Sequence, residues 1–223
     1  MLPKNESPDN KTPPLHDPWN NMNLVYENEE KCNILNKYFC SVTHLENENN
    51  NLPDFDERGS ETLGNIIVFE QDVDAIISTL NPNKAVGPDL ISNKMLIAVK
   101  NEIALPLSML FNKSLKLGVF PSDWKMSHVI PLFKKGDNSL ISNNRPVALL
   151  CCISKVLENI VYRHLYNHLH QNLLIYKFQS GSLPGHSTNH QLIELYHEIL
   201  LALDNSQLTS ITFCDISRAF DRV

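Results

Sequence analysis

Long apolar runs are absent from this sequence, and cysteine is scarce. No stretch reaches 18 apolar residues, so we expect no transmembrane helix. The first residues lack the apolar run of a signal peptide, which argues against secretion. The five cysteines are odd in number and form no C-x-x-C pair, so a disulfide framework and a zinc site are both poorly supported. We expect reduced, mostly buried thiols in an intracellular protein.

Several catalytic patterns are also missing. The sequence contains no nucleophile elbow, no P-loop and no dinucleotide fingerprint. His164 and His168 are four residues apart on an expected helix, but no glutamate completes an H-E-x-x-H pattern. We therefore interpret these histidines, and the pair His186 and His190, as surface or groove residues rather than metal ligands.

Positive charge is low overall but unevenly distributed. The net charge of −6 argues against a generally basic nucleic-acid binder. Residues 1–80 contain 5 Lys and Arg against 15 Asp and Glu, whereas residues 81–223 contain 14 against 10. The first part therefore carries −10 and the second +4. We expect any polyanion to lie against residues 81–223.

The remaining composition is that of a globular protein, with 42% hydrophobic and 20% charged residues among 223. Residues 1–25 show no periodicity and are predicted to be a disordered lead. Residues 26–80 are predicted to be a helical upstream segment, with helices over 28–42 and 70–80 separated by a linker over 44–65. A third region, residues 81–223, holds the remaining expected elements.

In that third region apolar residues recur at helical spacing in four segments. The expected helices cover 92–100, 102–117, 153–170 and 188–203. Ser92 is the expected cap of the first, and Gly118 is expected to end the second. The residues of the second helix that are expected to face inward are Leu107, Leu110, Phe111 and Leu115. Two expected strands, 128–133 and 147–150, would form a hairpin around a tight polar turn. Residues 208–216 are predicted to be a buried strand.

An acidic residue at the tip of that last strand is the first candidate site. Asp215 follows Ser-Ile-Thr-Phe-Cys, and a carboxylate held at a strand tip suits a divalent cation. Magnesium favours one or two carboxylates completed by substrate phosphates, and phosphoryl-transfer enzymes use such ions. The alternative is that Asp215 merely ends a strand or caps the next turn.

A group of cations at the hairpin is the second candidate site. Lys134, Lys135 and Arg145 flank a turn that contains Gly136. Such a hairpin could fold over a triphosphate, with Arg145 as a bidentate clamp. The alternative is a solvated turn with ordinary surface charge.

The order of these segments resembles the reverse transcriptase domain of jockey-like non-LTR retrotransposons. The similarity covers residues 81–223 and extends loosely to the helix over 28–42. The resembling blocks, in chain order, are NKAVGPDLISNKML (83–96), WKMSHVIPLFKKGDNSLISNNRPVALL (124–150), SKVLENIV (154–161), QSGSLPGHST (179–188) and TFCDISRAFDRV (212–223).

This resemblance implies a role for individual residues. Asp215 would be the first metal-binding carboxylate of the palm, and the Ile216 carbonyl a further metal ligand. Phe220 would lie under the sugar of the incoming nucleotide and exclude a 2′-hydroxyl. The three cations, Lys134, Lys135 and Arg145, would contact the triphosphate and template from the fingers.

The sequence departs from the family at three places. Ser182-Leu183 stands where the family usually has Phe-Arg, so the loop beside the template lacks a cation that would help to bind the template. Asn144 stands where the family often has a tyrosine. No Tyr-x-Asp-Asp string, which supplies the remaining catalytic carboxylates, occurs in the 223 residues. The resemblance therefore implies a fragment that ends after the first catalytic motif, without the thumb and without the endonuclease that such elements carry upstream.

The implied fold class is α+β and helix-rich: right-hand polymerase fingers with an incomplete palm. The implied function of the intact enzyme is RNA-directed DNA polymerisation with two Mg²⁺ ions as cofactors. Its implied partners are an RNA template, a DNA primer and dNTPs. Its implied location is the cytoplasm and nucleus, with no membrane association. The fragment alone is expected to be inactive. The alternatives are a non-catalytic relic that binds RNA or protein, and a helical scaffold with no nucleic-acid role.

Overall fold

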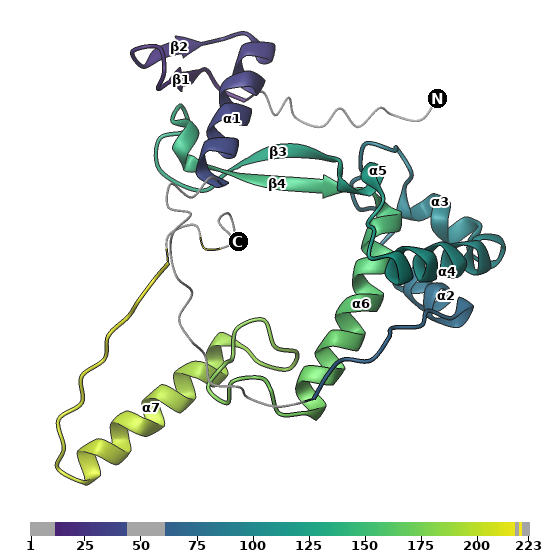
Figure 1. Cartoon of the computed structure of the whole chain (residues 1–223). Helices are drawn as coiled ribbons and strands as arrows, with labels where there is room; N and C mark the ends of the chain where they lie inside the picture. Colours follow the sequence, from purple (N-terminus) through teal and green to yellow (C-terminus); the bar gives the residue numbers. More distant parts are fainter. Residues whose placement is uncertain (1–11, 44–60, 217–218, 220–223) are drawn as a thin grey trace, which may run out of the picture. The chain divides into compact units, whose positions relative to one another are not determined.

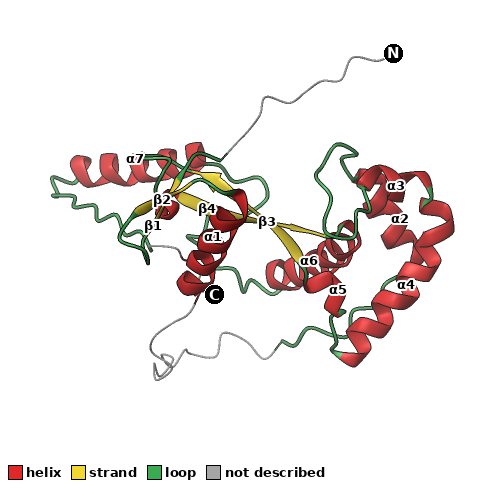
Figure 2. Cartoon of the chain, turned by 90° about the horizontal axis from the view of Figure 1, so that it is seen from above, coloured by secondary structure: helices red, strands yellow, loops and turns green. Residues whose placement is uncertain are grey.

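The structure, a computed structural model, describes residues 12–43, 61–216 and 219. This part of the chain forms seven helices, one 3-10 helix and two antiparallel sheets of two strands each (Figures 1 and 2). The expected helix-rich α+β class is thereby confirmed. The chain divides into two compact units, which we describe separately. Of the described residues, unit 1 contains 12–43, 66–160 and 219, and unit 2 contains 61–65 and 161–216.

Three helices form the main core of unit 1: α2 (Glu70–Thr79), α3 (Asn93–Ala98) and α4 (Lys100–Leu117). Helix α2 buries Val73, Ile76 and Ile77, the residues that its 3.6-residue spacing predicts. It packs mainly against α4. The boundary expected after residue 80 therefore falls between two helices of the same unit.

Helix α4 begins two residues earlier than predicted, so Pro106 lies in its second turn. It ends as predicted, because Gly118 adopts the left-handed conformation with φ 63° and donates to the Ser114 and Leu115 carbonyls. Phe111 is fully buried and meets Trp124 edge-to-face, with 5.7 Å between the ring centroids. The prediction that Leu110 faces inward is wrong, since 42% of it is exposed.

The expected hairpin is confirmed and is longer than predicted. After the short helix α5 (Ser122–Lys125), strand β3 (Ser127–Phe133) pairs antiparallel with β4 (Asn144–Leu150) along its full length. Helix α6 (Cys152–Gln171) follows directly and buries Val156, Leu157 and Ile160.

Residues 12–25 correct the prediction of a disordered lead. Strands β1 (Leu15–Asp17) and β2 (Asn23–Val25) form a small hairpin, and helix α1 (Asn28–Thr43) follows as predicted. Leu15 is fully buried in a cluster with Ile34 and Leu35 of α1. This burial orders a segment whose polar composition gave no periodic signal. Residues 1–11 lie outside the described part.

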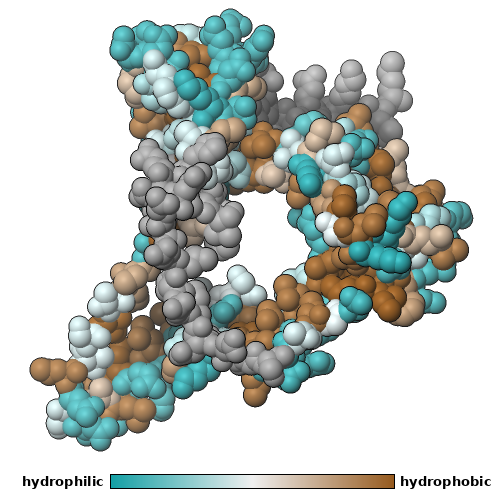
Figure 3. All heavy atoms as spheres, viewed as in Figure 1, coloured by the Kyte–Doolittle hydropathy of each residue, from teal (hydrophilic) through white to brown (hydrophobic). Residues whose placement is uncertain are grey.

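Unit 2 contains the last turns of α6 and the helix α7 (Thr188–Asp204), which Ser187 caps by accepting from the His190 amide. No residue of α7 is buried, and apolar side chains extend along it (Figure 3). Leu192, Ile193 and Tyr196 are each more than half exposed.

The buried strand expected over residues 208–216 is not present in the described structure. Residues 208–216 pair with no described strand, and Phe213 is 85% exposed. An apolar β-prone segment becomes a strand only when a neighbouring strand takes its hydrogen bonds, and no described segment does so. The palm sheet of the expected fold is therefore not observed among the described residues.

The cysteines are all free, as expected, but the prediction that most are buried is wrong. Cys151 and Cys152 are buried, whereas Cys32, Cys40 and Cys214 are exposed. Burial raises the pKa of the Cys152 thiol, so this thiol stays protonated and behaves as a core residue rather than a nucleophile.

Candidate functional site

The β3–β4 hairpin places the three predicted cations on one structural element. Arg145 lies directly opposite Leu132, and Ile130 lies opposite Val147. Directly opposed residues share a face, and that face repeats every second residue, so Arg145 stands beside these three apolar side chains. Leu132, Ile130 and Val147 are 53%, 48% and 37% exposed. One face of the hairpin is therefore an accessible apolar strip that ends in a guanidinium group.

The ten-residue connection that carries Lys134 and Lys135 has a defined conformation. The Lys134 amide donates to the Asn143 carbonyl at 2.9 Å, and the Asn143 side chain donates to the Asp137 carbonyl at 2.8 Å. Gly136 has φ 91°, a value that L-residues rarely adopt. These contacts hold the two lysines at the end of the hairpin.

Asp137 is the one carboxylate within this connection, and its own turn engages it. The amide and the hydroxyl of Ser139 donate to its Oδ1 at 2.9 and 2.6 Å. These hydrogen bonds lower the pKa of Asp137, and the nearby His16 acts in the same direction. The carboxylate is thus directed toward Ser139 rather than toward a lysine.

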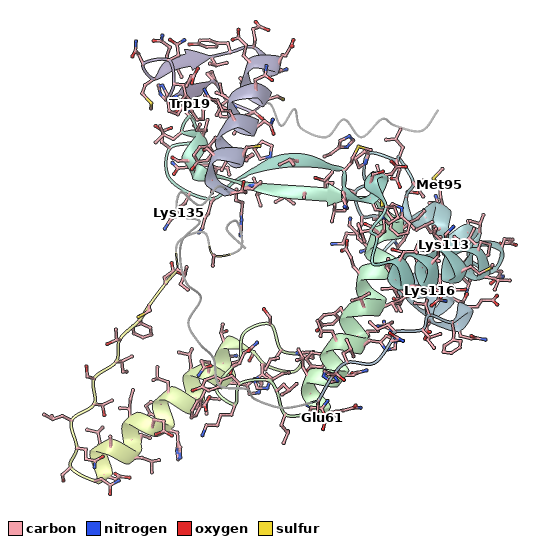
Figure 4. The ribbon with its side chains drawn as sticks, in the orientation of Figure 1. Trp19, Glu61, Met95, Lys113, Lys116 and Lys135 are labelled. Atoms are coloured by element: carbon pink, nitrogen blue, oxygen red, sulfur yellow. The ribbon has the colours of Figure 1, made fainter. Side chains whose placement is uncertain are left out.

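The three cations are exposed and available to an external anion. Within the described ranges, no ion pair or side-chain hydrogen bond involves Lys134, Lys135 or Arg145. Figure 4 shows Lys135 at the connecting end of the hairpin, whereas Lys113 and Lys116 lie on α4. Cations on one turn that have no partner among the described residues suit a polyphosphate or a nucleic-acid backbone.

The segment 12–43 packs against this connection, a contact that sequence reasoning missed. The His16 amide donates to the Ser139 carbonyl at 2.8 Å, and Ile141 is buried in the cluster formed by Leu15, Ile34 and Leu35. The connection is therefore not the purely polar turn that the sequence predicts. The adjacent apolar pair Leu140-Ile141 is the signal that could have revealed it.

At the other end of the hairpin, the resembling block over 83–96 packs against the β4–α6 junction. A Cβ atom on Gly87 would lie 2.6 Å from the Cys151 nitrogen and 2.7 Å from the Leu150 carbonyl carbon, so only glycine fits there. Asp89 accepts from the Ile91 amide at 3.2 Å, and Asn93 donates to the Asn81 carbonyl at 2.8 Å. This block thus contacts the base of the hairpin through Gly87.

Asp215 and Ile216 lie in unit 2, at the end of the described extended segment, and both are exposed. Phe220 falls outside the described residues. The structure therefore gathers Lys134, Lys135 and Arg145 on one hairpin and carries Asp215 in the other unit.

The metal-binding capacity of the described residues is small. They contain no group of three His, Cys, Asp or Glu side chains that could hold an ion. A single carboxylate with an adjacent carbonyl fits at most one Mg²⁺, completed by water and phosphate, and does not fit two.

Among residues 12–43 and 61–216, no helix has both the length and the apolar character needed to cross a bilayer. No protein-family model matches the chain.

Three curated proteins show what the sequence is similar to. The RNA-directed DNA polymerase from mobile element jockey of Drosophila funebris is 32% identical over 154 residues, which is 69% of this chain. In Drosophila melanogaster, the probable RNA-directed DNA polymerases from transposon BS and from transposon X-element are each 32% identical, over 70% and 68% of the chain. The chain spans 17% of the length of each of these relatives. The resemblance to jockey-like elements is thereby confirmed.

Proposed function

Because this chain is homologous to one segment of the RNA-directed DNA polymerases of non-LTR retrotransposons, we propose that it is the fingers and the beginning of the palm of such an enzyme. The observation that carries the proposal is the similarity to three such polymerases over about two thirds of the chain. The complete enzyme would transfer deoxynucleotides to a primer 3′-hydroxyl under the direction of an RNA template.

The β3–β4 hairpin supplies the nucleotide contacts in this proposal. Lys134 and Lys135 approach the triphosphate as point charges, and Arg145 contacts it through the two parallel donors of its guanidinium group. The unpaired state of all three side chains in the described structure supports this role. The template and the DNA primer would contact the same basic region.

Asp215 and the Ile216 carbonyl are proposed as ligands of one Mg²⁺, and Phe220 as the residue beneath the nucleotide sugar that excludes a 2′-hydroxyl. When bound, divalent ions activate the attacking oxygen and steady the leaving group in phosphoryl transfer. One carboxylate does not hold the two ions of that reaction, so we propose that the 223-residue chain does not polymerise by itself. Its proposed location is intracellular, in the cytoplasm and nucleus.

Binding and primer extension by the purified 223-residue chain test this proposal together. We expect it to bind an RNA template annealed to a DNA primer, with an affinity that falls steeply as salt rises, since phosphate contacts release counterions. We expect no extension in the presence of Mg²⁺ and dNTPs.

Two results would count against parts of this proposal. Extension that Asp215→Ala abolishes would show that the chain is active alone. The absence of salt-dependent binding would contradict the polymerase assignment. A second candidate function is that of a non-catalytic relic that binds RNA, and the presence of only one proposed metal-binding carboxylate, Asp215, favours it. The failure of a chain of twice this length to extend a primer would support this second candidate.

A further inference from the structure

The outer face of α4 is apolar, although it is exposed to solvent. Leu105, Met109, Leu110 and Leu117 recur there at helical spacing, and between 42% and 65% of each residue is exposed. The opposite face is centred on the fully buried Phe111, and α4 packs against α2. At about 100° per residue, Met109 lies about 160° around the helix from Phe111. A surface helix usually presents polar residues outward, so these four residues, the α4 stripe, indicate an interaction surface.

Three charged residues lie on the same face of α4 as the stripe. Glu102 precedes Met109 by seven residues, and Lys113 and Lys116 follow Met109 by four and seven residues. All three charged residues are exposed, and none forms an ion pair with another residue that the structure describes. Figure 4 shows both lysines on α4. The outer face of the helix is therefore acidic at its beginning and basic at its end.

The helix dipole offers a simpler reason for these charges. An acidic first turn and a basic last turn stabilise a helix that has no partner at all. The dipole does not account for the apolar stripe between the charges, however, because apolar side chains gain nothing from it. A partner that covers the stripe and also meets both charged ends accounts for the whole face.

A second, antiparallel copy of α4 complements this face position by position. If a two-fold axis passes through Met109, Glu102 of each copy lies opposite Lys116 of the other copy. Leu105 then lies opposite Lys113, whose alkyl stem is itself apolar. Each ion pair would lie about 10 Å from the axis, because a helix rises about 1.5 Å per residue. The face is therefore self-complementary in both charge and hydrophobicity.

We propose that the α4 stripe binds a second copy of this chain, so that two chains associate through antiparallel α4 helices as a symmetric dimer. The two apolar stripes bury each other, and the two Glu102–Lys116 pairs fix the direction and register of the helices. This association goes beyond the proposed polymerase role, because it uses neither the hairpin cations nor Asp215.

Analytical ultracentrifugation of the 223-residue chain tests the dimer. Between about 1 and about 100 µM, we expect the wild type to shift from monomer to dimer, as a modest interface does. Met109→Glu should raise the dissociation constant about tenfold or more, because it places two carboxylates together at the axis. Met126→Glu is the matched control, since Met126 is an exposed methionine outside α4, and its dissociation constant should equal that of the wild type.

Exchange of the two end charges separates the dimer from the helix dipole. Glu102→Lys and Lys116→Glu should each raise the dissociation constant about threefold or more, because like charges then face each other. The double variant restores opposite charges across the axis and should dimerise like the wild type. The dipole alone predicts the reverse order, because the double variant has an unfavourable charge at both ends of α4. Circular dichroism reports the helix content of each variant.

Three results would overturn the proposal. The first is a wild-type chain that stays monomeric at about 100 µM, in which case the stripe would be a surface for a different protein. The second is a dimer whose dissociation constant Met109→Glu leaves unchanged. The third is a double charge variant that dimerises more weakly than either single variant. None of these results bears on the polymerase assignment, which nucleotide binding and primer extension test separately.

Discussion

At the scale of single residues, Gly87 links the most motif-like block of the sequence to the hairpin. Its Cα faces the backbone of Cys151 and Leu150 so closely that no side chain fits between them. The sequence motif could indicate that a glycine matters at position 87. It could not show which residues this glycine contacts, because the contact joins segments that lie far apart along the chain. Burial of Ile141 escaped prediction for the same reason, since its partners Leu15 and Ile34 lie near the other end of the chain.

Gly87→Ala should destabilise the protein. The new methyl group would meet backbone atoms at 2.6–2.7 Å, and backbone cannot move aside as a flexible side chain can. Overpacking of this kind costs about 1–3 kcal/mol, so we expect the free energy of unfolding in urea to fall by about 2 kcal/mol.

Gly181→Ala is the control for that substitution. No heavy atom lies within 4 Å of the position that a Cβ atom would take at Gly181, so the free energy of unfolding of this variant should stay within about 0.5 kcal/mol of the wild type. If Gly87→Ala changed stability no more than Gly181→Ala, the close approach at the hairpin base would be refuted.

At the scale of elements, the sequence predicts the helices correctly, but the last strand that it predicts is not present in the described structure. Apolar spacing in α1, α2 and α6 depends only on each helix itself, as do the caps Ser92 and Gly118. The β3–β4 hairpin is also local, because its strands adjoin in sequence. Residues 208–216 have the composition of a strand but need a partner strand from elsewhere, and the described residues provide none.

Hydrogen exchange tests this contrast between elements. The amides of residues 208–216 form no backbone hydrogen bond with other described residues, whereas those of β3 and β4 pair along the whole hairpin. Exchange followed by mass spectrometry should therefore show residues 208–216 labelled within seconds and the hairpin protected for much longer. Equal protection of the two segments would mean that residues 208–216 form a strand in solution, as the sequence alone predicts.

At the scale of the whole molecule, the division into units could not be inferred from the sequence. Helix α6 runs continuously through the point where unit 1 gives way to unit 2, so no linker composition marks it. The uneven charge was predictable, and it agrees with the location of the hairpin cations after residue 81. Of the proposed site residues, the three cations belong to unit 1 and Asp215 to unit 2.

Nucleotide binding by the hairpin is the measurement that tests the central claim most directly. A fluorescent deoxynucleoside triphosphate is titrated with the wild-type chain and with a variant carrying Lys134→Ala, Lys135→Ala and Arg145→Ala. We expect the triple variant to bind about tenfold more weakly or worse, because it loses charge-assisted contacts to the phosphates. A variant carrying Lys113→Ala and Lys116→Ala, two exposed lysines of α4, should bind like the wild type. Equal affinity of the triple variant and the wild type would contradict the assignment of this hairpin as the nucleotide-binding edge of a polymerase.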